Sequence, residues 1–247
     1  MAANDVQRAD IDLRAFVKSL CAPIWWEQGR QTVVNSGSMC VLKTPEALIG
    51  ITNNHVLKIY EKHKAARDDI FCQLGSAPFD PTANLIACSE KWDLATFRIP
   101  ALTLRHWGHR VFEPVSWPPA AITMEDHCVY GGYPEYRRQV PPGPNPPTMT
   151  ADFVSFRANP HGCSDRNVSF QIDTAKLTWL PNVAMPLCED ADLSGMSGGP
   201  CFRMIGSENR IEYAGVIYEG RWDIGIIFVR QANLISASGQ IASPPGW

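Results

Sequence analysis

A serine surrounded by glycines is the feature of the sequence that most clearly suggests chemistry. Ser197 lies in the segment Gly195-Met-Ser-Gly-Gly-Pro200. Glycines at this density let the backbone approach another group closely or adopt dihedral angles that other residues avoid. A loop of this kind presents a nucleophilic hydroxyl in several hydrolases. The same pattern also fits a glycine-rich turn whose hydroxyl bonds its own backbone, and this segment alone leaves both interpretations open.

The order of the histidines along the chain separates two ways in which Ser197 could be a nucleophile. The segment fits Gly-x-Ser-x-Gly, the nucleophile elbow of α/β-hydrolases, and also Gly-x-Ser-Gly-Gly-Pro, the serine loop of trypsin-like peptidases. In an α/β-hydrolase the catalytic histidine follows the serine. All six histidines precede Ser197, at positions 55, 63, 106, 109, 127 and 161. We therefore exclude the elbow for a triad formed within this chain, and the order His, Asp, Ser remains open.

His55 has the surroundings that best suit a catalytic imidazole. It ends the segment Gly50-Ile-Thr-Asn-Asn-His55, in which a β-branched run is followed by two short polar residues. This pattern indicates a side chain presented at the end of a rigid strand, beside the core rather than inside it. A histidine on an ordinary surface loop is the alternative interpretation.

Three motifs in a fixed order resemble the HtrA-type branch of the trypsin-like serine peptidases. Thr52-Asn-Asn-His-Val56 is similar to its histidine motif, Lys91–Ile99 to its Asp-(Ile/Leu)-Ala strand, and Gly195–Pro200 to its serine loop. Gly131-Gly-Tyr-Pro134 resembles a strand end early in the second barrel of these proteins. The resemblance covers about residues 31–236. It implies an all-β, chymotrypsin-like double β-barrel and endopeptidase activity.

The resemblance implies a role for each motif residue. Ser197 would be the nucleophile, and His55 the general base that later protonates the leaving amine. Asp93 would be the buried carboxylate that orients the imidazole, although an aspartate here could also simply cap the turn before a strand. The backbone of Gly195, Met196 and Ser197 would form the oxyanion hole, through the amides of Gly195 and Ser197. This chemistry requires no metal and no cofactor.

Matching motif positions also predict the substrate pocket. Ala191 would lie at its base, and Tyr218, Glu219 and Gly220 along its wall, where the strand would pair with the substrate backbone. An alanine at the base disfavours Lys or Arg at the cleaved position, because a buried guanidinium needs a carboxylate partner. We therefore expect a small or medium apolar side chain there. A basic preference is the alternative, because acidic residues lie nearby at positions 189, 190, 192 and 219.

The sequence departs from the family pattern in three places. Met196 stands where trypsin has an aspartate that pairs with the new amino terminus, so we expect no activation through that ion pair. The residues that flank His55 lack the cysteine that forms a disulfide in secreted relatives. The sequence ends at Trp247, so we expect no PDZ domain of the kind that HtrA proteins carry.

The elements that position these residues are predicted to be short strands. From Gln31 onward, β-rich runs are bounded by Gly, Asn, Ser or Pro, and strands do not alternate with helices. A helix is predicted over residues 5–20, ended by Pro23, and a shorter helix between Val56 and Arg67. The predicted divisions are a helical extension (1–24), a first barrel (25–112), a connector (113–120), a second barrel (121–236) and a C-terminal tail (237–247).

The composition excludes several other classes of protein. The 247 residues are 45% apolar and 19% charged, which excludes a disordered chain. A net charge of −3 provides no general affinity for nucleic acid or an anionic membrane, so neither is an expected partner. No apolar run reaches the roughly 18–20 residues of a membrane-spanning helix. The N-terminus lacks the pattern of a secretory signal, so we expect a cytoplasmic protein whose eight cysteines are not paired in disulfides.

The sequence therefore predicts a hydrolase, a serine endopeptidase that cleaves a protein or peptide substrate through an acyl-enzyme. A regulatory protein partner is a further expectation, because indiscriminate cleavage would damage the host cell. Two alternatives remain. One is a catalytically silent peptidase-fold module that binds a partner, which the presence of all three candidate groups disfavours. The other is an esterase or acyltransferase that uses the same triad.

Overall fold

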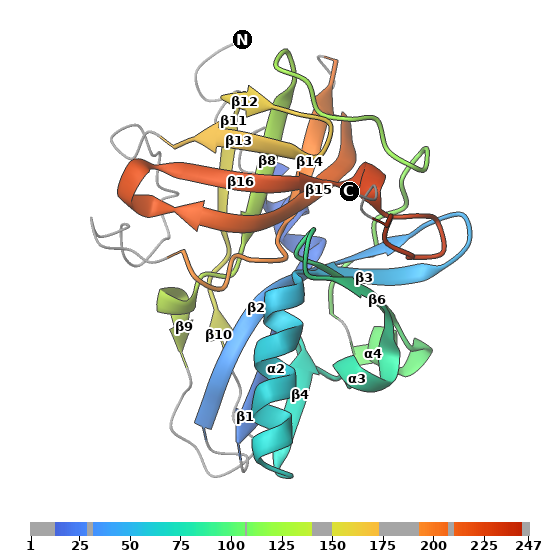
Figure 1. Ribbon diagram of the computed structural model, residues 1–247, viewed down its shortest axis with the longest axis vertical. Helices are drawn as coiled ribbons and strands as arrows, with labels where there is room; N and C mark the ends of the chain where they lie inside the picture. The colour runs from blue at the N-terminus through green and yellow to red at the C-terminus, as the bar shows by residue number, and fades with distance from the viewer. Residues whose placement is uncertain are drawn as a thin grey trace.

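Two curled antiparallel sheets form the framework of the protein (Figure 1). The computed structural model describes residues 13–28, 32–106, 108–139, 150–172, 193–206 and 210–243. The first sheet contains strands from the N-terminal half of the chain, and the second contains strands from the C-terminal half. In Figure 1 the second sheet occupies the upper half of the view, and the first sheet with helix α2 occupies the lower half. The prediction of an all-β chain is confirmed.

The first sheet has seven strands in the order β5-β4-β1-β2-β3-β7-β6. Their bounds are β1 Cys21–Gln28, β2 Thr32–Lys43, β3 Leu48–Thr52, β4 Ile70–Leu74, β5 Ala77–Pro78, β6 Leu85–Ser89 and β7 Leu94–Arg98. Three helices accompany them: α2 Asn54–Ala66, α3 Pro81–Asn84 and α4 Ala101–His106. Helix α2 confirms the helix predicted between Val56 and Arg67. It starts two residues after β3 ends, which places its first turn at the edge of the first sheet.

The second sheet also has seven strands, in the order β11-β8-β14-β15-β16-β13-β12. Their bounds are β8 His127–Gly132, β11 Val154–Ala158, β12 Gly162–Cys163, β13 Asn167–Gln171, β14 Pro200–Ile205, β15 Arg210–Arg221 and β16 Ile226–Gln231. A separate two-stranded ribbon pairs β9 Arg138–Gln139 with β10 Thr150–Ala151. Short 3-10 turns lie at η1 Glu135–Arg137, η3 Trp222–Ile224 and η4 Ala232–Leu234. Residues 113–121 contain neither helix nor strand, and the bounds of the two barrels stay predictions.

Three clusters of buried apolar side chains form the core. One lies within each sheet, and the third joins side chains from both sheets. The shared cluster includes Leu42 and Leu94 from the first sheet and Val129 and Phe202 from the second. Because this cluster buries apolar surface from both halves, it fixes how the two sheets face each other.

The described part of the predicted N-terminal helix agrees with the prediction to within one residue, but the chain continues differently after it. Residues 13–19 are helical, and β1 already begins at Cys21, inside the predicted helical extension. Pro23 therefore lies within a strand and not beyond a helix end. It is opposite Ser38, whose amide donates to the Ser197 carbonyl (2.8 Å), so the missing proline amide breaks no bond between these two residues. The predicted helical residues 5–12 lie outside the described ranges.

The side chains of this helix pack into the core that both sheets share. Leu13, Val17 and Leu20 are all buried in the shared cluster. An isolated helix of this length is marginal in water, so burial of this apolar face supplies most of its stability. The segment from Leu13 to Gln28 is thus part of the folded body, since it contributes both a core helix and a central strand.

Candidate active site

His55 lies in the first turn of helix α2, directly after strand β3. The predicted strand end is confirmed, but the turn that follows it is the start of a helix. The imidazole is 42% exposed, so it faces solvent from the edge of the first sheet. Asn53 precedes the helix and makes no side-chain cap to it. Its side-chain amide instead donates to the Asp93 carbonyl (2.8 Å), which ties the start of the helix to the turn before β7.

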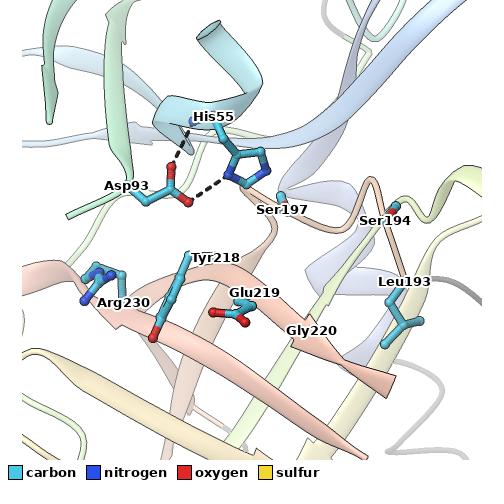
Figure 2. A pocket seen from close by; sticks show the side chains of 9 residues that line it. All are labelled: His55, Asp93, Leu193, Ser194, Ser197, Tyr218, Glu219, Gly220 and Arg230. Atoms are coloured by element: carbon cyan, nitrogen blue, oxygen red, sulfur yellow. Dashed lines mark hydrogen bonds and ion pairs between the residues drawn. The ribbon is translucent and has the colours of Figure 1, made fainter. Parts of the chain in front are cut away.

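Asp93 accepts two hydrogen bonds from His55. Its Oδ1 accepts from the His55 backbone amide at 2.9 Å, and its Oδ2 lies 2.7 Å from His55 Nδ1. Because an ionised carboxylate only accepts, the proton of the neutral imidazole is on Nδ1 and Nε2 keeps its lone pair. Figure 2 shows the ring directed toward Ser197. This arrangement leaves a basic nitrogen facing the serine.

The backbone at Asp93 has an unusual conformation that aims its side chain. Its φ is +49°, in the left-handed region, which aspartate enters more readily than most residues. The turn is closed by a bond from the Asp93 amide to the Glu90 carbonyl (3.2 Å). The Asp93 side chain is 24% exposed, so it is partly shielded from water beside the imidazole.

Ser197 lies at the centre of a tight loop between Leu193 and strand β14. Within the loop the Gly199 amide donates to the Met196 carbonyl (2.8 Å), and the Gly198 amide donates across to Ile217 in β15 (2.8 Å). Gly198 has a φ of +88°, and a β-carbon there would lie 1.9 Å from the Ser38 carbonyl oxygen. No other residue fits this position, which explains the glycine after the serine.

The backbone amides of Gly195 and Ser197 in the serine loop are used differently from those of the residues around them. The Ser194 carbonyl accepts from the Glu135 amide at 2.6 Å. Because C=O and N–H point in opposite directions across a trans peptide, the Gly195 amide faces the other way. Within the described part of the chain, neither the Gly195 amide nor the Ser197 amide donates a hydrogen bond to a protein group. A pair of free, neighbouring donors of this kind can bind a developing oxyanion.

The Met196 amide does not belong to this pair. It donates to the Leu193 carbonyl at 3.1 Å, so it closes the turn inside the loop. The Met196 side chain is 1% exposed and packs in the core of the second sheet. This corrects the inclusion of Met196 in the predicted oxyanion hole, because the middle amide of the loop is already used.

The candidate residues surround one cleft of about 470 Å³ between the two sheets (Figure 2). Its lining includes six of the predicted site residues: His55, Asp93, Ser197, Tyr218, Glu219 and Gly220. Leu193, Ser194 and Arg230 also line the cleft, although the sequence did not point to them. Ala191, the predicted base of the pocket, lies outside the described residues. The structure thus brings together side chains up to 175 positions apart in sequence, from His55 to Arg230 (230 minus 55).

Comparisons with known proteins bear on the fold of the chain. No protein-family model matches the sequence, and no curated protein matches it either. Solved structures do match. A serine endoprotease from Yersinia pestis superposes with a TM-score of 0.54 at 13% identity, covering 91% of this chain and 62% of its own. Deg5 superposes with a TM-score of 0.53 at 13% identity, covering 94% of this chain and 91% of its own. The active form of the Rv3671c protease from M. tuberculosis superposes with a TM-score of 0.52 at 19% identity, covering 95% of this chain and 86% of its own.

The chain has the trypsin-like serine peptidase fold. The predicted chymotrypsin-like double β-barrel is therefore confirmed, with each seven-stranded sheet forming one barrel. The resemblance to HtrA-type proteases at the level of fold is confirmed too. This chain spans 62% of the length of the Yersinia pestis chain, so the activity of that whole protein is not transferred with the fold.

Ser38 is a residue of this trypsin-like fold that the sequence did not single out. Its buried hydroxyl donates to the Gly195 carbonyl (2.8 Å) and accepts from the Tyr133 amide (2.9 Å). Its backbone amide donates to the Ser197 carbonyl (2.8 Å). Ser38 belongs to β2 in the first barrel, whereas all three partners belong to the second. It thus joins the barrels at the serine loop, and the Ser-Gly-Ser run at 36–38 is the only signal of it in the sequence.

Other kinds of site are not evident in the described ranges. In them, no three His, Cys, Asp or Glu side chains lie close enough together to hold a metal ion. The seven cysteines that the structure describes are free. No described helix is both long enough and apolar enough to cross a membrane.

Proposed function

We propose that the protein is a serine endopeptidase that hydrolyses peptide bonds through an acyl-enzyme. The observation that carries the proposal is the 2.7 Å contact between His55 Nδ1 and the Asp93 carboxylate, in the same cleft as Ser197. This contact directs the basic Nε2 toward the serine hydroxyl, which is a weak nucleophile until a base takes its proton. The neighbouring amides of Gly195 and Ser197 supply the second requirement, which is stabilisation of the tetrahedral intermediate.

In the proposed reaction Ser197 Oγ attacks the substrate carbonyl while His55 Nε2 accepts the hydroxyl proton. The carbonyl electrons move onto oxygen, which accepts hydrogen bonds from the amides of Gly195 and Ser197. Collapse of this intermediate breaks the C–N bond, and His55 donates its proton to the departing amine. Water then attacks the ester by the same route and releases Ser197. Asp93 keeps its negative charge throughout and stabilises the imidazolium.

Strand β15 offers an edge on which an extended peptide can bind. The ladder between β14 and β15 ends at the pair Pro200 and Val216. Beyond this pair, β15 continues along the cleft through Tyr218, Glu219 and Gly220. An open strand edge binds an extended chain through main-chain hydrogen bonds. This feature favours a peptide substrate over a small ester, because an ester does not use such an edge.

A fluorophosphonate probe tests the nucleophile directly. The wild-type protein should form a covalent adduct on Ser197, whereas Ser197→Ala should form none. Ser194→Ala is the matched control, because this serine lines the same cleft without facing His55. It should still be labelled. Absence of labelling in the folded wild-type protein would favour a catalytically silent binding module.

Peptide and ester substrates then separate the two enzymatic alternatives. An endopeptidase should cleave an internal bond of an unstructured protein, with the product ends identified by mass spectrometry. Cleavage must disappear in Ser197→Ala. Labelling by the probe together with turnover of esters alone would instead indicate an esterase or acyltransferase. The cytoplasmic location and a regulatory partner remain predictions that these experiments do not address.

A further inference from the structure

Arg230 is a buried arginine that reaches from the second barrel to the turn that carries Asp93. It belongs to β16 and is 7% exposed. Its Nε donates to the Trp92 carbonyl at 2.8 Å, and its Nη1 donates to Asn167 Oδ1. The guanidinium also stacks on the Tyr218 ring, 4.1 Å from the ring centroid. Three separate contacts therefore hold this side chain in one orientation.

The contact with Trp92 acts on the residue directly before Asp93. The Trp92 carbonyl belongs to the peptide that joins these two residues, so a bond to it limits rotation at Asp93. The backbone of Asp93 is in the left-handed region (φ +49°), where an unsupported aspartate is less stable than in an extended conformation. In Figure 2 Arg230 and Tyr218 lie below Asp93, on strands β16 and β15 of the second barrel. The serine barrel thus supports the conformation of a residue in the other barrel.

The charge of Arg230 is not neutralised by an ion pair within the described residues. Its hydrogen-bond acceptors there are a backbone carbonyl and an amide oxygen, which are both neutral. Burial lowers the pKa of Arg230, and the nearby groups Tyr218 and Asp93 raise it. An arginine keeps its charge under these conditions because its ordinary pKa lies far above neutral pH. A buried positive charge therefore lies behind the Asp93 carboxylate.

Several other charged or titratable groups surround this position. The Asp93 carboxylate is hydrogen-bonded to the His55 imidazole. Lys91 and Arg166 both lie over the Trp92 ring, at 5.5 and 4.7 Å from its centroid. Glu219 follows Tyr218 on β15 and lines the same cleft. Of these groups, the guanidinium of Arg230 is the cation bonded to the backbone next to Asp93.

We propose that Arg230 is a positioning residue for the Asp93–His55 pair, which holds the Trp92–Asp93 peptide and supplies a positive charge behind the carboxylate. This role deepens the proposed function and rests on it for its kinetic consequences. A positive charge near the pair disfavours the protonated imidazolium. Its removal should therefore stabilise imidazolium, so that loss of activity on acidification starts at a higher pH.

Two substitutions separate the charge of Arg230 from its geometry. Arg230→Met keeps the length of the side chain but removes both the charge and the donors. We expect kcat/KM to fall about 10- to 100-fold, as it does when a reacting group is slightly misplaced. We also expect the acidic limb of the pH profile to move to higher pH. Arg230→Lys keeps the charge but cannot reproduce the planar fork. It should lower kcat/KM while leaving the acidic limb near that of the wild-type protein.

Arg203→Met is the matched control. Arg203 lies in β14 of the same barrel, bonds Glu212 at 2.7 Å and does not line the cleft. Its substitution also removes a largely buried arginine, so it reports the general cost of such a change. We expect a lower melting temperature for this variant and an unchanged pH profile.

NMR titration of His55 keeps this test separate from the proposed function. The pH midpoint of the His55 ring signals can be followed in the folded protein whether or not it cleaves peptides. In Arg230→Met the midpoint should rise, whereas in Arg203→Met it should not move. An unmoved or lowered midpoint in folded Arg230→Met would overturn the proposal. If Arg230→Met does not fold, the test rests on Arg230→Lys. A wild-type kcat/KM together with a wild-type His55 midpoint in Arg230→Lys would show that the guanidinium has no specific role, and would also overturn the proposal.

Discussion

The two halves of the candidate active site are held in place by different forces. The serine loop is fixed by backbone hydrogen bonds and by glycines that allow close contact, as at Gly198 against Ser38. The His55–Asp93 pair is fixed by side-chain hydrogen bonds and by the charged Arg230 behind it. The first half depends on steric room, and the second depends on charge and on protonation.

This difference determines how each half should respond to mutation. An added methyl group in the serine loop has no space, so it disturbs the interface between the barrels along with the chemistry. A change of charge at Asp93 keeps the same shape and alters the chemistry alone. Mutations in the two halves should therefore separate loss of folding from loss of catalysis.

The largest expected effect is that of Gly198→Ala. The new β-carbon would lie 1.9 Å from the Ser38 carbonyl oxygen and 2.2 Å from Thr52 Oγ1, at a φ of +88°. Both contacts are with the first barrel, so the barrels must move apart. We expect a loss of more than about 4 kcal/mol in the free energy of unfolding, together with loss of fluorophosphonate labelling. Thermal denaturation and labelling measure the two effects.

Gly206→Ala is the matched control for backbone conformation. Gly206 also has a positive φ, +64°, but a β-carbon there would meet nothing within 4 Å. Gly206→Ala should lower the free energy of unfolding by about 1–2 kcal/mol, which is the conformational penalty alone, and should leave fluorophosphonate labelling intact. Similar melting temperatures for the two variants would show that the serine loop is not sterically constrained.

The next effect in size is that of Asp93→Asn, in the other half of the site. The amide keeps the shape of the carboxylate, and asparagine also tolerates a positive φ, so the fold should be retained. An amide cannot orient the imidazole in the same tautomer, and we expect kcat to fall by about 10⁴-fold with little change in melting temperature. Steady-state kinetics and calorimetry provide the measurements.

Asp80→Asn is the control for this substitution. Asp80 also lies in the first barrel, where it caps helix α3 through the amides of Thr82 and Ala83. Its variant should turn over substrate at the wild-type rate. Near-normal turnover in Asp93→Asn would mean that another group orients His55, and the role of Asp93 would have to be reassigned.

The same difference explains which residues could be predicted from the sequence. His55, Asp93 and Ser197 each lie in a short motif, and their order along the chain already excluded one fold. Helix α2 and most strands follow from local patterns of apolar residues. Ser38 and Arg230 act through contacts with residues distant in sequence, and no local pattern distinguishes them from ordinary strand residues.

Two local predictions failed where a backbone donor is used in an unexpected place. Pro23 was expected to end a helix, yet it lies in β1, because its partner Ser38 uses its amide to bind the serine loop. Met196 was expected to contribute to the oxyanion hole, but its amide closes the turn. At Pro23 a contact between distant parts of the chain determined where a backbone donor is used, and at Met196 a turn inside the loop did. The apolar and motif patterns of the sequence do not show which acceptor a backbone amide will use.

A smaller effect is expected for Ser38→Ala, at the junction of the two halves. It leaves the Tyr133 amide and the Gly195 carbonyl without the hydroxyl that each now contacts. An unsatisfied buried group costs about 1–3 kcal/mol, so the melting temperature should fall by several degrees. Activity should fall too, because Gly195 carries one amide of the proposed oxyanion hole.

Ser36→Ala provides the control on the same strand. Ser36 is also buried, but its hydroxyl has no hydrogen-bond partner in the described structure. Removal of that hydroxyl should be neutral or slightly stabilising, because no bond is lost. If both serine variants lost the same stability, the cost would come from β2 packing and not from the bonds that Ser38 makes.

The smallest expected effect concerns Glu219, whose carboxylate lines the cleft from the serine half. The nearest cation along the strand, Arg221, is already paired with Asp223 at 3.0 Å. Glu219 is exposed, so its attraction to a basic substrate side chain should amount to no more than about 0.2–1 kcal/mol.

Glu219→Gln should thus lower kcat/KM by about 1.4- to 5-fold for peptides with Lys or Arg near the scissile bond. Neutral peptides should be cleaved as before, and the difference should shrink at high salt because exposed charges are screened. Glu61→Gln, a change at a partly exposed position on α2 outside the cleft, controls for net charge. A preference for basic peptides that survives in Glu219→Gln would place the selecting acid elsewhere in the pocket. No preference in the wild-type protein would favour the apolar specificity that Ala191 predicts.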